Sequence, residues 1–149
     1  YTECLKTLEE LRNCELVPFI AGIENDAQFI MTAHVAYPNV TKDNTPATLS
    51  TYFITDLLRN EMGYKGIIIT DAMNMDAIAK YYSEDTAAIL AIQAGVDMIL
   101  MPNDFQKSFD SVVKAVKSKK IKEKRIDESV YRILQYKQKH FNFLNLNRE

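Results

Sequence analysis

The 149-residue chain is poor in cysteine, in long apolar runs and in excess charge of either sign. Its two cysteines, Cys4 and Cys14, have no second pair and no nearby histidine, so no metal site is predicted. On one continuous helix their ten-residue separation would be about 15 Å, too far for a disulfide. No apolar run reaches the ~18 residues that a membrane span needs. The net charge of −2 gives no reason to expect nucleic acid or an anionic membrane as a partner.

The rest of the composition is that of an ordinary globular protein, with 47% apolar and 26% charged residues. The length corresponds to one domain. Basic residues gather between Lys117 and Arg125, but acidic residues interrupt them, which favours a solvated helix end over a binding patch. The chain starts at Tyr1 without a recognisable signal peptide. Because a start without Met is compatible with processing, the sequence leaves the compartment open.

The most informative stretch is a short apolar strand followed by a carboxylate. Gly63 suits the end of a helix, where a left-handed residue is needed. The β-branched run 67–69 then indicates a strand buried on both faces, as in a parallel sheet. Asp71 follows at its carboxyl end, where parallel α/β folds place their catalytic groups. On position alone, a plain loop or helix-capping aspartate is an equally good interpretation.

The whole chain alternates helices with strands, which predicts an α/β fold with parallel strands and right-handed crossovers. Three parallel strands make a poor complete sheet because both edges are bare. A (β/α)8 TIM-type barrel needs about 250 residues. We therefore interpret the chain as the C-terminal three strand–helix units of such a barrel. The pattern predicts strands over 27–33, 66–70 and 97–101, and helices over 2–14, about 18–25, 51–62, 77–82, 84–94, 104 to about 117 and 128 to about 141, with Ser50, Asp76, Ser83, Asp104 and Asp127 as caps.

The stretch 57–74 resembles the active-site signature of glycoside hydrolase family 3. In that family the aspartate that matches Asp71 is the catalytic nucleophile. The block 31–38, with His34 at its centre, is similar to the β-N-acetylglucosaminidase branch of the family. The matching elements are Leu57-Leu58, Arg59, Glu61, Gly66, the apolar run, Thr70-Asp71 and Asn74, and further similarity extends over 46–50, 94–98 and 125–134.

The resemblance implies a retaining glycoside hydrolase that acts on terminal β-linked N-acetylglucosamine without a metal or other cofactor. Such enzymes pair a nucleophilic carboxylate with an acid/base group. In the resembled branch the acid/base is a histidine in a Gly-rich loop after an earlier strand, and residues 1–149 contain no such loop. We therefore expect 1–149 to be a partial catalytic domain, inactive alone, whose partner is the N-terminal remainder of the barrel. The alternatives are a non-catalytic half-barrel that binds sugar or another chain, and a phosphorolytic relative.

Three further residues are expected to contact the sugar. His34 stands at the end of its strand, in a block that the resemblance places in the pocket wall. A structural hydrogen bond and proton transfer are the other roles considered for it. Met73 lies beside the nucleophile and Met101 at the end of the third strand, and both are candidates for substrate binding or for core packing.

Overall fold

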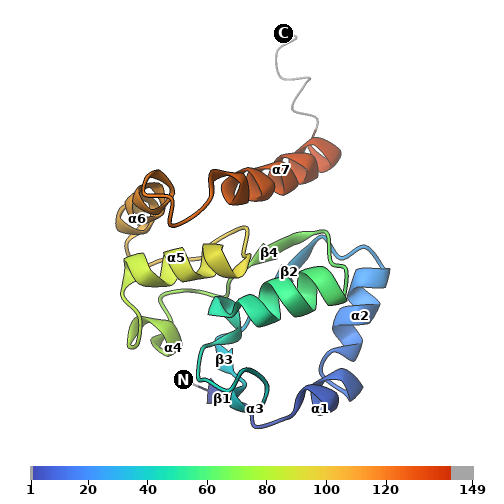
Figure 1. Ribbon diagram of the computed structural model, residues 1–149. Helices are drawn as coiled ribbons and strands as arrows, with labels where there is room; N and C mark the ends of the chain where they lie inside the picture. Colours follow the sequence, from blue (N-terminus) through green and yellow to red (C-terminus); the bar gives the residue numbers. More distant parts are fainter. Residues whose placement is uncertain (1, 142–149) are drawn as a thin grey trace.

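The computed structural model describes residues 2–141, in which helices surround short parallel strands (Figure 1). The helices α6 and α7 lie at one end of the molecule, and α1 and α3 lie at the other. The elements in chain order are β1 (Thr2–Glu3), α1 (Leu8–Asn13), α2 (Val17–Glu24), β2 (Phe29–Met31), β3 (Val35–Ala36), α3 (Pro38–Thr41), the short helix η1 (Ala47–Leu49), the wide helix η2 (Tyr52–Glu61), β4 (Ile67–Ile69), α4 (Asp76–Ala79), α5 (Glu84–Ala94), α6 (Phe105–Lys117) and α7 (Glu123–His140).

The central sheet is parallel, as the alternation of helices and strands predicts. β2 pairs with β4 in a register that sets Ile30 beside Ile68. On the other side of β4, Met98 forms a single parallel bridge with Ile69, so the predicted strand 97–101 is present only as this bridge. Side chains make hydrogen bonds here that backbone groups would make in a longer strand. The carboxylate of Asp97 accepts the Ile68 N–H at 3.0 Å, and the Leu100 N–H donates to a threonine hydroxyl.

The amino-terminal segment differs from its prediction. A helix was expected from residue 2, but α1 begins at Leu8 because Thr7 and Glu10 form a capping box that fixes its start. The residues before the cap form β1, which pairs in parallel with β3. This pairing was not predicted, because both strands are only two residues long and carry no periodic signal. Cys4 therefore follows a strand and does not share a helix with Cys14.

The residues that typically end and begin helices correctly predicted the end of α5 and the start of α6. Gly95 ends α5 with φ +117°, and Asp104 caps α6 by accepting the Lys107 N–H. Two other caps lie one residue from their predicted positions. Thr51, not Ser50, precedes η2, and Asp76 is the first residue of α4 instead of its cap.

The last helix starts earlier and is rotated differently than predicted. α7 begins at Glu123, five residues before the expected start, so Asp127 is not its cap. The apolar spacing of Val130, Ile133 and Leu134 predicts that they form the inner face of this helix, but Val130 and Leu134 are exposed and Ile133 is half-buried. Arg125, Ser129 and Arg132, spaced along one side of the helix, all bond to the carboxylate of Asp97. We infer that these polar contacts, rather than apolar packing, set the rotation of α7.

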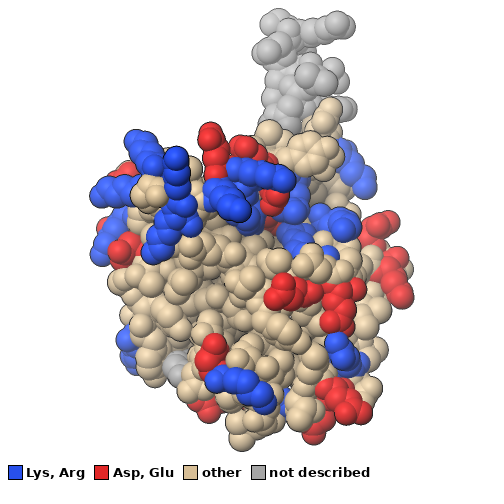
Figure 2. Space-filling model, in the orientation of Figure 1, with Lys and Arg blue, Asp and Glu red and all other residues tan. Residues whose placement is uncertain are grey.

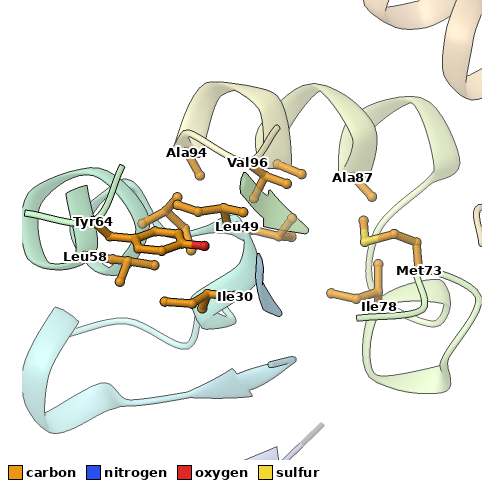
Figure 3. Close-up of a cluster of buried hydrophobic side chains, with 12 residues drawn as sticks. Ile30, Leu49, Leu58, Tyr64, Met73, Ile78, Ala87, Ala94 and Val96 are labelled. Atoms are coloured by element: carbon orange, nitrogen blue, oxygen red, sulfur yellow. The ribbon is translucent and has the colours of Figure 1, made fainter. Parts of the chain in front are cut away.

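The main core lies between the sheet and the helices on one side of it (Figure 3). Because strand side chains alternate, Ile30 and Ile68 point into this core, whereas Phe29 and Met31 point to the opposite face. These two are 41% and 51% exposed. Tyr136 of α7 covers only the amino end of that face, with its ring edge-on to Phe29 at 4.8 Å between centroids. The core comprises Ile30, Leu49, Ile54, Leu58, Tyr64, Ile68, Met73, Ile78, Ala87, Ala91, Ala94 and Val96.

Charged side chains gather at the end formed by α6 and α7, where Figure 2 shows Lys and Arg at the top of the view. The lysines between α6 and the first turn of α7 are exposed, which agrees with the predicted solvated helix end. Across residues 2–141, every helix is too short or too polar to cross a lipid bilayer.

Candidate active site

The candidate site lies where β2, β4 and the segment after Met98 reach their carboxyl ends. Thr70, fully buried, fixes the position directly before Asp71. Its N–H donates to the Met98 carbonyl at 3.0 Å, and its hydroxyl accepts the Leu100 N–H at 2.9 Å. The backbone that carries Asp71 is thus anchored to its neighbour in the sheet by both a main-chain and a side-chain bond.

Asp71 is partly exposed at this end of the sheet. Its Oδ1 accepts the N–H of the next residue, Ala72, at 2.7 Å. This bond fixes the carboxylate relative to the loop, and the partial exposure leaves it accessible to a substrate. A carboxylate held in this way can act as a nucleophile or as an electrostatic partner for developing positive charge.

The loop after Asp71 is held from one side by the segment at residues 100–101. The Met73 N–H donates to the Leu100 carbonyl at 2.9 Å, and the Asn74 N–H donates to the Met101 carbonyl at 3.1 Å. Met101 itself adopts φ +45°, an uncommon conformation for a residue with a side chain. Strained backbone of this kind is concentrated at functional sites, and here it turns the chain so that its carbonyl meets the loop.

His34 holds the same loop from the other side. It is buried, with 5% of its surface exposed, and both ring nitrogens have partners. Nε2 lies 3.1 Å from the Ala72 carbonyl, and Nδ1 lies 2.9 Å from the Thr48 hydroxyl. A carbonyl can only accept, so Nε2 carries the proton and, in the neutral ring, Nδ1 accepts from Thr48. This is the structural hydrogen bond considered from the sequence; contact of His34 with a sugar stays a prediction.

The two methionines predicted to bind substrate are placed differently. The side chain of Met73 is 4% exposed and packs in the core with Ile78 and Ala87 (Figure 3). This burial favours its core-packing alternative over the sugar contact. Met101 is 56% exposed beside the Asp71 loop, and its contact with a substrate stays a prediction.

A buried aspartate at the opposite, amino-terminal end of the strands was missed as a key residue. The side chain of Asp97 is fully buried, and it bonds to three arginines, Arg59, Arg125 and Arg132. Burial lowers the pKa of Arg59 to about 10, and the negative charge of Asp97 opposes this shift. A charged residue inside the apolar stretch 96–99 was the available signal, because a buried charge requires a partner.

Among residues 2–141 no three His, Cys, Asp or Glu side chains come together as a metal site would require.

Comparison with known proteins identifies the class. Residues 2–136 match the Glycosyl hydrolase family 3 N terminal domain. The chain therefore belongs to glycosyl hydrolase family 3, as the sequence signature indicated. Beta-hexosaminidase A of Pseudoalteromonas piscicida is 30% identical over 151 residues, which cover 88% of this chain and 25% of the relative. A beta-hexosaminidase of Nitrosomonas eutropha is 39% identical over 95 residues, covering 64% of this chain and 27% of the relative.

Solved structures give the same relationship. A family 3 β-N-acetylglucosaminidase from Paenibacillus superposes with a TM-score of 0.88 at 40% identity, covering 91% of this chain and 26% of that protein. The β-glucoside phosphorylase BglX superposes with a TM-score of 0.86 at 26% identity, covering 93% of this chain and 26% of that protein. The present chain thus spans about a quarter of the length of these relatives.

Proposed function

We propose that residues 1–149 are the nucleophile-bearing part of a retaining β-N-acetylglucosaminidase, with Asp71 as the nucleophile. The observation that carries the proposal is the placement of Asp71. It is partly exposed at the carboxyl end of β4, in the position that the family signature assigns to the nucleophile, on a loop held from both neighbouring segments. The substrate class follows from the block 31–38 and from relatives named β-hexosaminidase and β-N-acetylglucosaminidase.

In the proposed reaction a carboxylate oxygen of Asp71 attacks the anomeric carbon of a terminal β-linked N-acetylglucosamine. The bond from that carbon to the leaving oxygen breaks, and a covalent glycosyl-enzyme forms. A proton must reach the leaving oxygen, and the same acid/base group then activates the water that releases the sugar. We expect this group to come from outside residues 1–149, because His34 uses Nε2 to hold Ala72 and the chain has no Gly-rich histidine loop.

We further propose that the chain supplies the last three strand–helix units of a (β/α)8 barrel, with the rest of the barrel as its partner. Two features support this. The face of β2 that carries Phe29 and Met31 is apolar and largely uncovered, as the interior of an incomplete barrel would be. The two solved structures also align with nearly all of this chain, whereas the chain spans about a quarter of their length. In a closed barrel these side chains fill the interior in layers.

A phosphorolytic reaction is the second candidate, because a β-glucoside phosphorylase superposes over 93% of the chain. The first half-reaction would be the same attack by Asp71. Phosphate instead of water would then take the sugar from the enzyme, and the product would be a sugar 1-phosphate.

The test uses the full polypeptide that contains residues 1–149. We expect it to hydrolyse an aryl β-N-acetylglucosaminide, and Asp71→Asn to lower kcat by about 10⁴-fold or more. Asp76→Asn is the matched control, because this exposed carboxylate five residues later pairs with Lys80 on α4 and not, among residues 2–141, with the Asp71 loop. Near-normal turnover by Asp71→Asn would refute the assignment. Phosphate-dependent release of N-acetylglucosamine 1-phosphate would decide for the phosphorolytic candidate.

A further inference from the structure

We propose that His34 is a positioning residue that sets the orientation of the Asp71 carboxylate through the backbone of Ala72. This inference rests on the proposed role of Asp71 as nucleophile. It assigns His34 neither a sugar contact nor proton transfer, but a mechanical link between β2 and the nucleophile loop.

The peptide unit that joins Ala72 to Met73 is held at both of its polar atoms. Its carbonyl accepts from His34 Nε2 at 3.1 Å, and its N–H donates to the Leu100 carbonyl at 2.9 Å. Both polar atoms of one peptide plane are therefore bonded to different neighbouring segments. A peptide plane held at both ends cannot rotate without breaking one of these bonds.

The position of the Asp71 carboxylate depends on this peptide plane. The N–H of Ala72 donates to Asp71 Oδ1 at 2.7 Å, and its direction depends on the φ and ψ angles of Ala72. Because Thr70 anchors the chain before Asp71 and the peptide plane after Ala72 is held on both sides, few combinations of these angles remain open. Removing the bond to His34 frees the plane on one side, so the Ala72 N–H loses its set direction and the carboxylate loses its set position.

His34 is itself held in the orientation that this role needs. Thr48, fully buried, lies 2.9 Å from His34 Nδ1, and the hydroxyl of Thr32 lies 2.9 Å from the Thr48 hydroxyl. The two threonine hydroxyls form a buried relay that orients the ring, and the Ala72 carbonyl, which can only accept, sets the proton on Nε2. Because a donor is needed at Nε2, a side chain with an N–H at that position can replace the ring in part.

The proposal makes a specific kinetic prediction in the full polypeptide that contains residues 1–149. His34→Ala should lower kcat for an aryl β-N-acetylglucosaminide by about 100-fold, since an error of about 1 Å in placement costs this much. KM should change by less than about threefold, because no sugar contact is lost. His34→Gln, whose amide N–H can reach the Nε2 position, should recover most of the loss, whereas His34→Asn, which is too short, should not.

Thr48→Val tests the relay without touching the ring, and we expect kcat to fall by about 10-fold. Thr55→Val is its matched control, because the hydroxyl of that threonine donates to the Ala94 carbonyl between η2 and α5, away from the site. Unfolding curves for each variant separate lost activity from lost folding. Nitrogen NMR of the wild type adds a readout independent of activity, with Nε2 protonated and Nδ1 unprotonated at neutral pH.

The outcomes are distinct. If His34→Ala raises KM and leaves kcat intact, His34 contacts the sugar directly and the proposal is wrong. Failure of a folded His34→Gln variant to recover kcat, or a proton on Nδ1 alone, also overturns it. A wild-type protein without glycosidase activity overturns the proposed function first, and an active wild type with an unaffected His34→Ala overturns the positioning role alone.

Discussion

The buried carboxylate of Asp97 offers the sharpest test of what holds this chain together. Oδ2 pairs with Arg59 and accepts the Ile68 N–H at 3.0 Å. Oδ1 accepts from Ser129 at 2.6 Å and from Arg132 at 3.0 Å. One side chain therefore joins η2, β4 and α7. The perturbation is Asp97→Asn, which keeps the size of the side chain but removes its charge and replaces one acceptor with a donor.

The expected loss follows from the groups left behind. Removing one member of a buried ion pair typically costs about 3–5 kcal/mol, because the other charge stays buried without compensation. Here the amide NH₂ would face N–H donors whichever way it is turned, although on the Oδ1 side the Ser129 hydroxyl can accept from it. Arg59 and Ile68 lie on one side, and the arginines of α7 lie on the other. Since several positive groups lose their partner together, we expect the free energy of unfolding to fall by at least about 3 kcal/mol.

The assay is urea unfolding followed by far-UV circular dichroism, on the full polypeptide, with the slope m compared between variants. Asp110→Asn is the matched control, because that carboxylate is exposed on α6 and should matter by less than about 0.5 kcal/mol. If Asp97→Asn loses less than about 1 kcal/mol with an unchanged slope, the bonds to Asp97 do not stabilise the fold to the expected extent.

Three further results are expected. Gly66→Ala should lower the free energy of unfolding by about 1–3 kcal/mol, because the added Cβ would lie 2.8 Å from the Gln28 carbonyl oxygen. Gly22→Ala should raise it by about 0.5–1 kcal/mol, because α2 has room for a methyl group at that position. Urea unfolding of both variants measures the two effects. Burial raises the pKa of Tyr64 to about 12, so the folded state favours the protonated phenol. The stabilisation from the protonated phenol is complete below about pH 10 and is lost as the pH rises to about 12. We expect urea unfolding at a series of pH values to show a loss of roughly 2–3 kcal/mol, which Tyr64→Phe should abolish. Residues 1–149 alone should not turn over an unactivated disaccharide, because no acid/base group is supplied; robust turnover would point to His34 as proton donor.

The sequence predicted the features that depend on neighbouring residues. Gly95 and Asp104 mark the end of one helix and the start of the next, and the β-branched run gives β4. These signals work because a left-handed end, a cap and a buried strand each need particular residue types at one place. The position of Asp71 followed from the same local pattern.

What the sequence did not predict depends on residues far apart in the chain. The bond from His34 to Ala72 spans 38 positions, and the link from Asp97 to Arg132 spans 35. Apolar periodicity predicted that Val130 faces inward, but it is exposed, and we infer that the bonds to Asp97 set the rotation of α7 instead. Sequence patterns indicate which face of a helix is apolar, but they do not indicate where buried ion pairs determine the orientation of the helix.

The contact between Phe29 and Tyr136 has a consequence for the order of folding. It joins β2 to the last helix across roughly 100 residues of chain, and closing so long a loop costs about 2 kcal/mol more entropy than closing one of ten residues. The pairing of β2 with β4 and the core above it involve much shorter separations. We therefore expect α7 to dock late, so that the amino-terminal end of the sheet stays open to water and to other chains until synthesis has passed Tyr136.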